Sequence, residues 1–336
     1  MRVDFFARRA HYIDHIAPIW NAIPVTRLGM FVTTEDLRAY ASNLIGSERI
    51  VIYDGQTVPG DNPVLTASYG DMIRAARNPA RKIISCEHGT GHAFGTAAYP
   101  DGKGKRDLVS LFLMPNEHTA RKSQSVRDTP CEVIGTPKMD EYIPAIRPTL
   151  LSQPVIAIAF HWNNGNADPP ESGNAWEHYK DILPALAERY NVIGHGHPLS
   201  VETFRPAFKQ AGIEFVENFR DVLQRADIYI NDLSSTMYEF LITGKPVVVL
   251  NAPWFRRDVH WGIRFWEWSN VGINVENPAD LFNAIDTTIE HYNDICLVER
   301  FQAVVDLYPY LGHASQRAAE IITMYLREWE KNRNDL

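Results

Sequence analysis

The clearest fold signal in the chain is Ile228-Tyr-Ile-Asn-Asp-Leu-Ser-Ser-Thr-Met-Tyr-Glu-Phe240, which Thr243-Gly-Lys-Pro-Val-Val-Val-Leu-Asn251 follows closely. A short apolar run bounded by polar residues is typical of a buried strand, and the residues after the polar turn have helical spacing. The second apolar run predicts another buried strand. A strand, a helix and a strand in this order predict a parallel sheet covered by helices.

The polar turn in this stretch is a candidate binding site. Ser234, Ser235 and Thr236 stand where the predicted helix begins. Unpaired backbone N–H groups and the positive end of the helix dipole favour an anion there, such as a phosphate. Glu239 follows Thr236 by three residues and shares its side of the helix, where a carboxylate could hold ribose hydroxyls. The turn therefore predicts a nucleotide diphosphate site, with ordinary helix capping as the alternative.

Length and composition limit the function classes. The chain has 336 residues, which suits two domains, and its net charge of −8 argues against a general nucleic-acid binder. The three cysteines are far apart and show neither metal spacing nor a disulfide framework. There is no signal-peptide pattern, and no apolar run approaches the roughly 20 residues of a membrane span. We therefore expect a cytoplasmic protein without a transmembrane segment.

Apolar runs and helical patterns alternate along both halves of the chain. The first half predicts strands at Val3–Ala7, Gly29–Thr33, Arg49–Tyr53, Pro63–Ser68, Lys82–Cys86, Leu108–Met114 and Cys131–Ile134. The second half predicts strands at Val155–Phe160, Asn191–His195, Ile213–Val216, Asp227–Asn231 and Pro246–Leu250, and helices that include Trp176–Tyr190 and Ala314–Asn332. We expect an α/β fold with a Rossmann-like domain at 1–145, a second at 151–312 and a C-terminal helix at 313–336. A cleft between the halves would hold the ligand.

Histidines follow two of the predicted strands. His88 precedes Gly89-Thr-Gly91, and an imidazole there could take the proton of an acceptor hydroxyl, with a turn-capping histidine as the alternative. His195 and His197 end another strand, and a histidine here could donate a hydrogen bond to a leaving phosphate. A metal site at this pair is the weaker interpretation, because no third ligand is close in sequence.

Three further segments are candidates for ligand contact. His161, Asn163 and Asn164 would line the same cleft, unless they form an ordinary polar loop. Lys138 could meet a phosphate as a point charge or lie in solvent. The segment 252–268 places four tryptophans among three arginines: Trp254, Trp261, Trp266 and Trp268 with Arg256, Arg257 and Arg264. This composition suits base or sugar stacking, the packing of a long loop or a membrane-surface patch.

Taken together, these motifs resemble the CDP-glycerol glycerophosphotransferase family, the teichoic-acid polymerases and primases. The resemblance extends over about Ala80 to Ile321. The matching motifs are, in chain order, His88-Gly89-Thr90, Pro115-Asn-Glu-His118, Gly135-Thr-Pro-Lys-Met-Asp140, His197-Pro198, Asp232-Leu-Ser-Ser-Thr236 with Glu239, Lys245-Pro246 and Gly312-His-Ala-Ser-Gln-Arg317.

The resemblance implies a GT-B architecture, in which two Rossmann-like domains face each other and the second holds most of the nucleotide. It implies a transferase that needs no metal and no cofactor, with His88 and His197 as catalytic residues. The donor-binding residues that it implies are Gly89, Thr90, Lys138, His161, His195, Pro198, Asp232, Ser234, Ser235, Thr236 and Glu239.

The predicted reaction moves a glycerophosphate or sugar group from CDP-glycerol or a UDP-sugar to an acceptor hydroxyl. The acceptor could belong to a polyol phosphate, a glycan, a modified nucleic-acid base or another soluble molecule. A non-hydrolysing sugar-nucleotide 2-epimerase and a non-catalytic nucleotide-sugar binding module are the alternatives. The sequence leaves the transferred group and the oligomeric state open.

Overall fold

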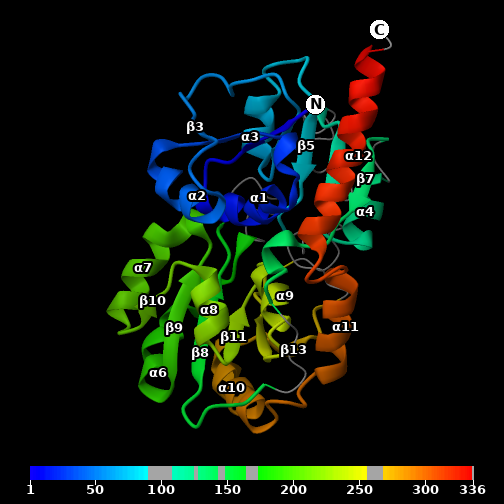
Figure 1. Ribbon diagram of the computed structural model, residues 1–336. Helices are drawn as coiled ribbons and strands as arrows, with labels where there is room; N and C mark the ends of the chain where they lie inside the picture. The colour runs from blue at the N-terminus through cyan, green and yellow to red at the C-terminus, as the bar shows by residue number, and fades with distance from the viewer. Residues whose placement is uncertain (90–107, 125–127, 143–147, 164–172, 256–267, 335–336) are drawn as a thin grey trace. The chain divides into compact units, whose positions relative to one another are not determined.

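The computed structural model describes residues 1–89, 108–124, 128–142, 148–163, 173–255 and 268–334. The chain divides into two compact units (Figure 1). The first unit holds Met1–Thr90, Phe94–Tyr142 and Asp306–Leu336, and the second holds Gly91–Ala93 and Ile143–Val305.

The first unit is built on a seven-stranded parallel sheet in the order β3-β2-β1-β4-β5-β6-β7. Its strands are β1 (Val3–Phe6), β2 (Leu28–Thr33), β3 (Ile50–Ile52), β4 (Val64–Thr66), β5 (Ile83–Cys86), β6 (Leu111–Met114) and β7 (Cys131–Val133). Its described helices are α1 (Ala10–Ala22), α2 (Arg38–Ile45), α3 (Tyr69–Ala75), α4 (Glu117–Gln124) and α12 (Ala314–Asn334), with 3₁₀ turns η1 (Val25–Arg27), η2 (Glu35–Leu37) and η4 (Pro137–Met139). The strand order reverses between β1 and β4, which makes this pair the topological switch point.

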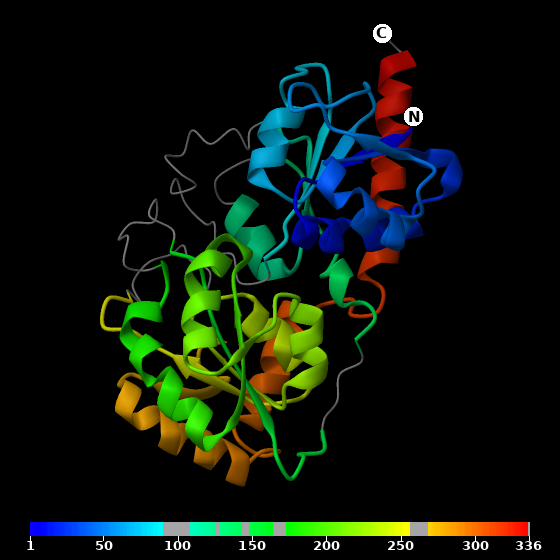
Figure 2. The same ribbon diagram turned by 90° about the vertical axis from the view of Figure 1, so that its left-hand side faces the viewer.

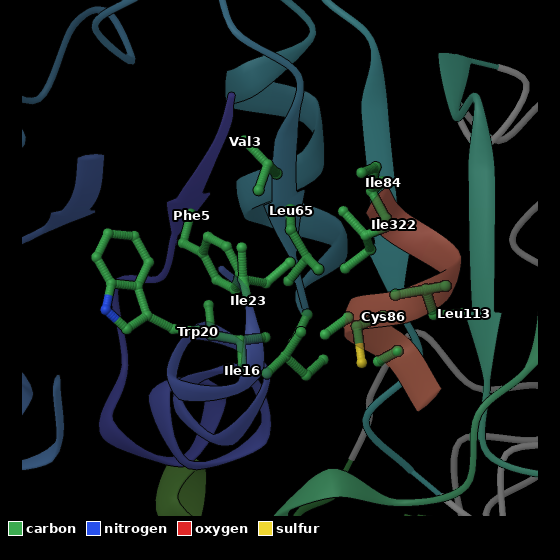
Figure 3. Close-up of a cluster of buried hydrophobic side chains, with 14 of the residues drawn as sticks. Val3, Phe5, Ile16, Trp20, Ile23, Leu65, Ile84, Cys86, Leu113 and Ile322 are labelled. Carbon is green, nitrogen blue, oxygen red and sulfur yellow. The ribbon is translucent and has the colours of Figure 1, made fainter. Parts of the chain in front are cut away.

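Apolar side chains cover both faces of this sheet. One buried cluster joins the sheet to α1, α2 and α12, and another joins it to α3 and α4. Figure 3 shows the first cluster, in which Phe5 and Ile84 of the sheet lie with Trp20 of α1 and Ile322 of α12. The Phe5 and Trp20 rings meet edge to face, with centroids 5.2 Å apart. Because both faces are buried, the strands are continuous apolar runs without alternation.

The second unit repeats the same winding with a six-stranded parallel sheet in the order β10-β9-β8-β11-β12-β13. Its strands are β8 (Val155–Phe160), β9 (Asn191–Gly196), β10 (Glu214–Phe215), β11 (Ile228–Asn231), β12 (Val247–Leu250) and β13 (Gly272–Val275). Its described helices are α5 (Trp176–Tyr179), α6 (Leu183–Arg189), α7 (Val201–Gln210), α8 (Phe219–Arg225), α9 (Thr236–Leu241) and α10 (Leu281–Glu290), with 3₁₀ turns η6 (Lys180–Ile182), η7 (Pro198–Ser200) and η9 (Pro278–Asp280). Helix α11 (Leu297–Leu307) crosses the boundary between the units.

Successive residues of β11 point to opposite faces of this sheet, as in any strand. Ile228 and Ile230 join the cluster that holds α5, α6, α7 and α10. Tyr229 points the other way and packs against Phe219 of α8 and Phe240 of α9, at ring distances of 5.7 and 5.1 Å. Helices therefore cover both sides of the sheet (Figure 2).

The predicted α/β class with two parallel sheets is confirmed, but some elements differ from the prediction. Helices α3 and α4 and strand β13 were not expected. Strand β13 opens with a glycine, which weakens its strand signal, yet a Cβ at Gly272 would lie 2.1 Å from the Val247 carbonyl oxygen. The predicted helix over Trp176–Tyr190 is divided into α5, η6 and α6. Pro184 lies in the first turn of α6, where a proline is tolerated because its missing N–H is not needed.

The boundaries of the units differ from the expected domains. The second unit ends at Val305 and not at residue 312, and the expected separate C-terminal helix is part of the first unit. Helix α12 packs against α1 and supplies Ala318, Ile322 and Leu326 to the first core. No helix in the described ranges has the length and apolar character that a membrane crossing requires.

Candidate functional site

The predicted donor residues of the second unit lie at or just after the carboxyl ends of β8, β9 and β11, which are neighbours in its sheet. His161 follows β8, His195 and His197 lie at the end of β9, and the turn from Asp232 to Thr236 follows β11. The strand order of this sheet reverses between β8 and β11. Open α/β sheets bind ligands outside the strand ends at such a switch point, so the fold itself favours a site here.

The turn after β11 holds a chain of hydrogen-bonded hydroxyl groups. Asn231 Nδ2 donates to the Tyr229 hydroxyl (3.3 Å), and Tyr229 and Thr236 Oγ1 are joined by a hydrogen bond of 2.8 Å in which Tyr229 is the donor when Thr236 gives its own hydrogen to Ser234. Thr236 Oγ1 in turn donates to Ser234 Oγ (2.8 Å), which also accepts from the Thr236 N–H (3.3 Å). Ser234 Oγ therefore accepts twice within the turn and keeps its own hydrogen for another acceptor. Ser234 is half-buried, so a phosphate oxygen could take that hydrogen.

Helix α9 itself contributes little to anion binding. It begins at Thr236 and ends at Leu241, so it is too short for a full dipole. Ser235 is its N-terminal flanking residue and makes no side-chain capping bond. The Asn231 side chain accepts from the Ser234 N–H (3.1 Å), so that amide is already paired. The hydroxyl chain, and not the helix end, is therefore the feature of the turn that suits an anion.

Asp232 holds the turn in place and is completely buried. Its Oδ1 accepts from the N–H groups of His161 (3.0 Å) and Leu233 (2.7 Å), and its Oδ2 accepts from the Ala175 N–H (2.8 Å). One carboxylate thus joins the end of β8, the start of α5 and its own turn. Both oxygens bind backbone, and the predicted contact between Asp232 and the donor stays a prediction.

A backbone N–H group fixes the tautomer of His197. The Leu199 N–H donates to His197 Nδ1 (3.2 Å), so the neutral ring carries its proton on Nε2. Pro198 begins the 3₁₀ turn η7 and fixes the chain direction there. The His197 ring lies 4.9 Å from the His161 ring and 5.7 Å from the Trp162 ring, and it is partly exposed.

His161 is buried and uncharged near neutral pH. Its Nδ1 lies 2.8 Å from the Trp162 carbonyl oxygen and 3.1 Å from that of Gly173, so Nδ1 carries the proton. Burial lowers the pKa of His161 to about 4, although these two carbonyls favour the protonated form. A neutral ring with its proton on Nδ1 has an acceptor nitrogen, Nε2, which suits a ligand hydroxyl.

His195 is a structural residue of β9. Its Nδ1 lies 2.7 Å from the Val216 carbonyl oxygen, its ring packs 5.5 Å from that of Phe219, and only 5% of it is exposed. The glycines beside it allow α7 to approach, because a Cβ at Gly194 would lie 2.5 Å from the Phe208 ring. The first three residues of Gly194-His-Gly-His197 therefore pack closely against neighbouring elements. The fourth, His197, has a partly exposed imidazole.

Glu239 lies within α9 and is completely buried. Its charge, with that of Asp232, raises the pKa of Tyr229, after the larger contribution of burial. No part of Glu239 is open to a ribose in this structure, so ribose binding by Glu239 stays a prediction.

The predicted base His88 and the predicted donor residues Gly89 and Thr90 belong to the first unit. His88 follows β5 and is half-buried, and Gly89 beside it is buried, while Thr90 lies outside the described residues. The Tyr12 ring of α1 meets the His88 ring edge to face at 5.0 Å, and the His15 ring lies 5.8 Å away. Sequence reasoning missed both α1 residues, although polar rings on an otherwise apolar helix face are a usable signal.

His11 and Lys138 also belong to this group. Burial, followed by the charges of His88, Lys138 and Arg9, lowers the pKa of His11 to about 3. These charges identify Lys138, on η4, as a near neighbour of α1. Its predicted contact with the donor stays untested, but it lies with His88 in the first unit.

The tryptophan-rich segment is described only at its ends. Trp254 Nε1 donates to the Asn174 carbonyl oxygen (3.0 Å), and its ring packs 5.8 Å from His178, which agrees with the packing interpretation. Residues 256–267, with Trp261 and Trp266, lie outside the described residues, as does Asn164. The described ranges contain no group of three or more His, Cys, Asp or Glu side chains arranged to hold a metal ion.

Part of the chain matches a family model. Residues 177–323 match the model of the CDP-glycerol:poly(glycerophosphate) glycerophosphotransferase family. The match includes β9, the turn after β11 and the first half of α12, and it confirms the resemblance to this transferase family that the motifs indicated. No curated protein is similar enough in sequence to count as a relative.

Solved structures establish the fold over almost the whole chain. A putative UDP-N-acetylglucosamine 2-epimerase from Listeria monocytogenes is 14% identical with a TM-score of 0.66, covering 98% of this chain and 97% of that one. The wall teichoic acid polymerase TagF, soaked with CDPG, is 14% identical with a TM-score of 0.65, covering 98% and 89%. The S. aureus MnaA structure with UDP is 15% identical with a TM-score of 0.63, covering 97% of both chains. These likenesses confirm the GT-B fold.

Proposed function

We propose that this chain is a glycerophosphotransferase that uses CDP-glycerol as its donor. The observation that carries the proposal is the turn after β11, where a hydroxyl chain leaves the Ser234 hydrogen for a phosphate oxygen, inside the segment that matches the glycerophosphotransferase family. A TagF structure soaked with CDPG is among the similar structures and agrees with this donor. A UDP-sugar is the second candidate donor.

The proposed reaction is a phosphoryl transfer. The oxygen of an acceptor hydroxyl attacks the phosphorus that carries glycerol, and its bond to that phosphorus forms as the bond to the bridging oxygen of the donor breaks. CMP leaves with that oxygen, and the hydroxyl proton passes to His88 as general base. The Ser234 hydroxyl and His197 Nε2–H stabilise the negative charge that grows on the departing phosphate.

We propose that these hydrogen-bond donors replace a metal ion and that no cofactor takes part. Ser234 and His197 supply directed hydrogens where a divalent ion would otherwise neutralise phosphate charge. We propose a polyol phosphate as the acceptor, since the matched family transfers to poly(glycerophosphate) by its description. A glycan or a modified nucleic-acid base is an outcome that the acceptor screen below would reveal.

A 2-epimerase is the second candidate function, because two of the similar structures carry that name. An epimerase would convert a UDP-sugar with no acceptor present. A transferase releases nucleotide only when it moves a group to an acceptor or to water, so products from donor alone separate the two classes.

The test is thermal stabilisation by CDP-glycerol, UDP-sugars, GDP-sugars and ADP-sugars in excess EDTA, followed by product analysis with polyol phosphate, glycan and modified nucleic-acid acceptors. A ligand that binds only the native state raises the melting temperature. At a ligand concentration of a hundred times Kd, the free energy of unfolding increases by about 2.7 kcal/mol. We expect a shift with CDP-glycerol and release of CMP only with acceptor. No shift with any donor in the panel would contradict the assignment of the donor site.

A further inference from the structure

We infer that Tyr12 on α1 is a positioning residue for His88, and that it acts on the proposed transferase reaction through the orientation of this imidazole. The inference rests on the proposed function for its catalytic consequence, but the contact between Tyr12 and His88 can be tested without activity. Nothing in the sequence motifs assigns a role to this tyrosine.

The first argument is the geometry around His88. The Tyr12 and His88 rings meet edge to face at 5.0 Å, with an angle of 82° between their planes. The His15 ring, three residues further along α1, approaches His88 at 5.8 Å and 76°. Residues three apart lie on the same side of a helix, so α1 presents two rings side by side to one imidazole. Such contacts restrict the ring to a narrow range of orientations.

Tyr12 is itself held in place by residues at the starts of α1 and α3. The His11 ring packs against it at a centroid distance of 4.0 Å, and Ser68, Arg8 and Asp71 are the polar and charged neighbours that act on its hydroxyl. Ser68 caps α3, because its Oγ accepts from the Asp71 N–H at 3.3 Å. Asp71 is buried and forms an ion pair with Arg8, just before α1, at 2.5 Å. The start of α1 is thus tied to the start of α3, and Tyr12 lies within this connection.

The strand order relates α1 and α3 to the strand that precedes His88. Helix α1 begins after β1 and α3 begins after β4, and these strands form the switch point of the first sheet. His88 follows β5, the next strand along. A general base must be held within a fraction of an ångström of its working position, and a misplacement of about 1 Å can cost about 10²-fold in rate. Tyr12 connects the rigid switch-point helices to the base.

The experiment compares Tyr12→Phe, Tyr12→Ala and a matched control, Tyr40→Ala. Tyr40 also packs, half-buried, against the first core and hydrogen-bonds through its hydroxyl to Asp14, but it lies on α2. We expect Tyr12→Ala to lower kcat by about 10- to 100-fold with the donor Kd changed less than about twofold. Tyr12→Phe keeps the ring and should retain kcat within about threefold, and Tyr40→Ala should leave kcat at the wild-type value.

A second readout is independent of turnover. In protein labelled with ¹⁵N-histidine, the His88 ring signals are assigned by their loss in His88→Gln. We expect Tyr12→Ala to shift and broaden them, and Tyr12→Phe to retain them. Unchanged His88 signals in Tyr12→Ala, or equal losses of kcat in Tyr12→Ala and Tyr40→Ala, would overturn the inference. If the wild-type protein turns over no donor, a shift of the His88 signals still supports the positioning contact, while the proposed function fails.

Discussion

The turn after β11 shows how side-chain hydrogen bonds can direct a single proton. Tyr229 is completely buried, and its ring is fixed between Phe219 and Phe240. It bonds to Thr236, which bonds to Ser234. In the proposed donor site, a residue that cannot touch the phosphate would thus orient the hydroxyl that does.

Ser234→Ala and Tyr229→Phe should both weaken donor binding, for different reasons. Loss of the Ser234 hydroxyl removes a hydrogen bond to a charged group, which is worth about 1.5–3 kcal/mol, so Kd should rise by about 10- to 100-fold. Tyr229→Phe only frees the Thr236 hydroxyl, and Kd should rise less, by about threefold to tenfold. Calorimetric titration with CDP-glycerol measures both. Tyr292→Phe is the control, since Tyr292 is also buried and donates to the Asp227 carbonyl oxygen. An equal effect of all three changes would refute the hydroxyl chain.

His88→Ala and His197→Ala should separate chemistry from binding. Without its general base the enzyme should lose about 10²–10⁴-fold in kcat, while the donor Kd stays nearly unchanged. His197→Ala removes a hydrogen bond to the donor phosphate and should raise Kd as well as lower kcat. Steady-state kinetics with calorimetry distinguishes them. A His88→Ala enzyme with normal turnover would show that another group takes the proton.

At the scale of elements, Asp232 connects three segments that the sequence separates widely. Its carboxylate binds backbone N–H groups at the end of β8, the start of α5 and the turn after β11. The end of β8 carries His161 and the turn carries Ser234, so the relative position of two site residues depends on this one carboxylate. A buried carboxylate that accepts three backbone hydrogens is a strong structural joint.

Asp232→Ala should therefore destabilise the second unit strongly. Three buried N–H groups lose their acceptor, each at about 1–3 kcal/mol, and we expect a loss of about 3–5 kcal/mol in the free energy of unfolding. Urea denaturation followed by tryptophan fluorescence measures the change. Asp227→Ala serves as the matched control, because buried Asp227 accepts from the single Val155 N–H at 2.9 Å and should cost less. A loss no larger than in the control would mean that Asp232 is not the joint.

Most strands of this fold could be predicted because buried parallel strands have short, continuous apolar sequences. Val155–Phe160 matches β8 residue for residue, and β11 starts one residue later than predicted. Strand β13 was not predicted because it begins with Gly272, which has a low strand propensity. The glycine is needed for close approach to β12, and this contact cannot be predicted from neighbouring residues alone. The site was predicted as residues at strand ends. The joint at Asp232 and the ring of Tyr12 beside His88 were not, because both depend on contacts across more than 50 residues.

At the scale of the whole molecule, the last helix does not belong to the unit that precedes it in sequence. Helix α12 returns to the first unit, where Ala314 and Ser315 donate their N–H groups to the Asp140 carboxylate at 2.9 and 2.7 Å. Asp140 ends the Gly135-Thr-Pro-Lys-Met-Asp140 motif, and Ala314 opens the helix of the Gly312-His-Ala-Ser-Gln-Arg317 motif. Two family motifs that are far apart in the chain are thus one structural unit, a helix and its cap.

The stability of the molecule should fall below neutral pH, with one contribution from each unit. His11 in the first unit and His161 in the second have pKa values of about 3 and about 4, compared with 6.5 for an ordinary histidine. Above pH 6.5 both are neutral in the folded and unfolded states and add nothing. As the pH falls below 6.5, these histidines become protonated in the unfolded chain but stay neutral in the folded chain. The free energy of unfolding therefore decreases until the pH reaches the pKa values of the folded state.

This acid sensitivity is assigned to the two histidines by substitution. Each should contribute at most about 1.4 kcal/mol per pH unit, or about 2 kcal/mol between pH 7 and pH 5. Urea denaturation at pH 7, 6 and 5 should show a shallower pH dependence in His11→Gln and His161→Gln than in the wild-type protein. Exposed His291 supplies the control, and His291→Gln should keep the wild-type slope. If the free energy of unfolding of His11→Gln and His161→Gln depends on pH as steeply as that of the wild-type protein, other groups cause the pH dependence.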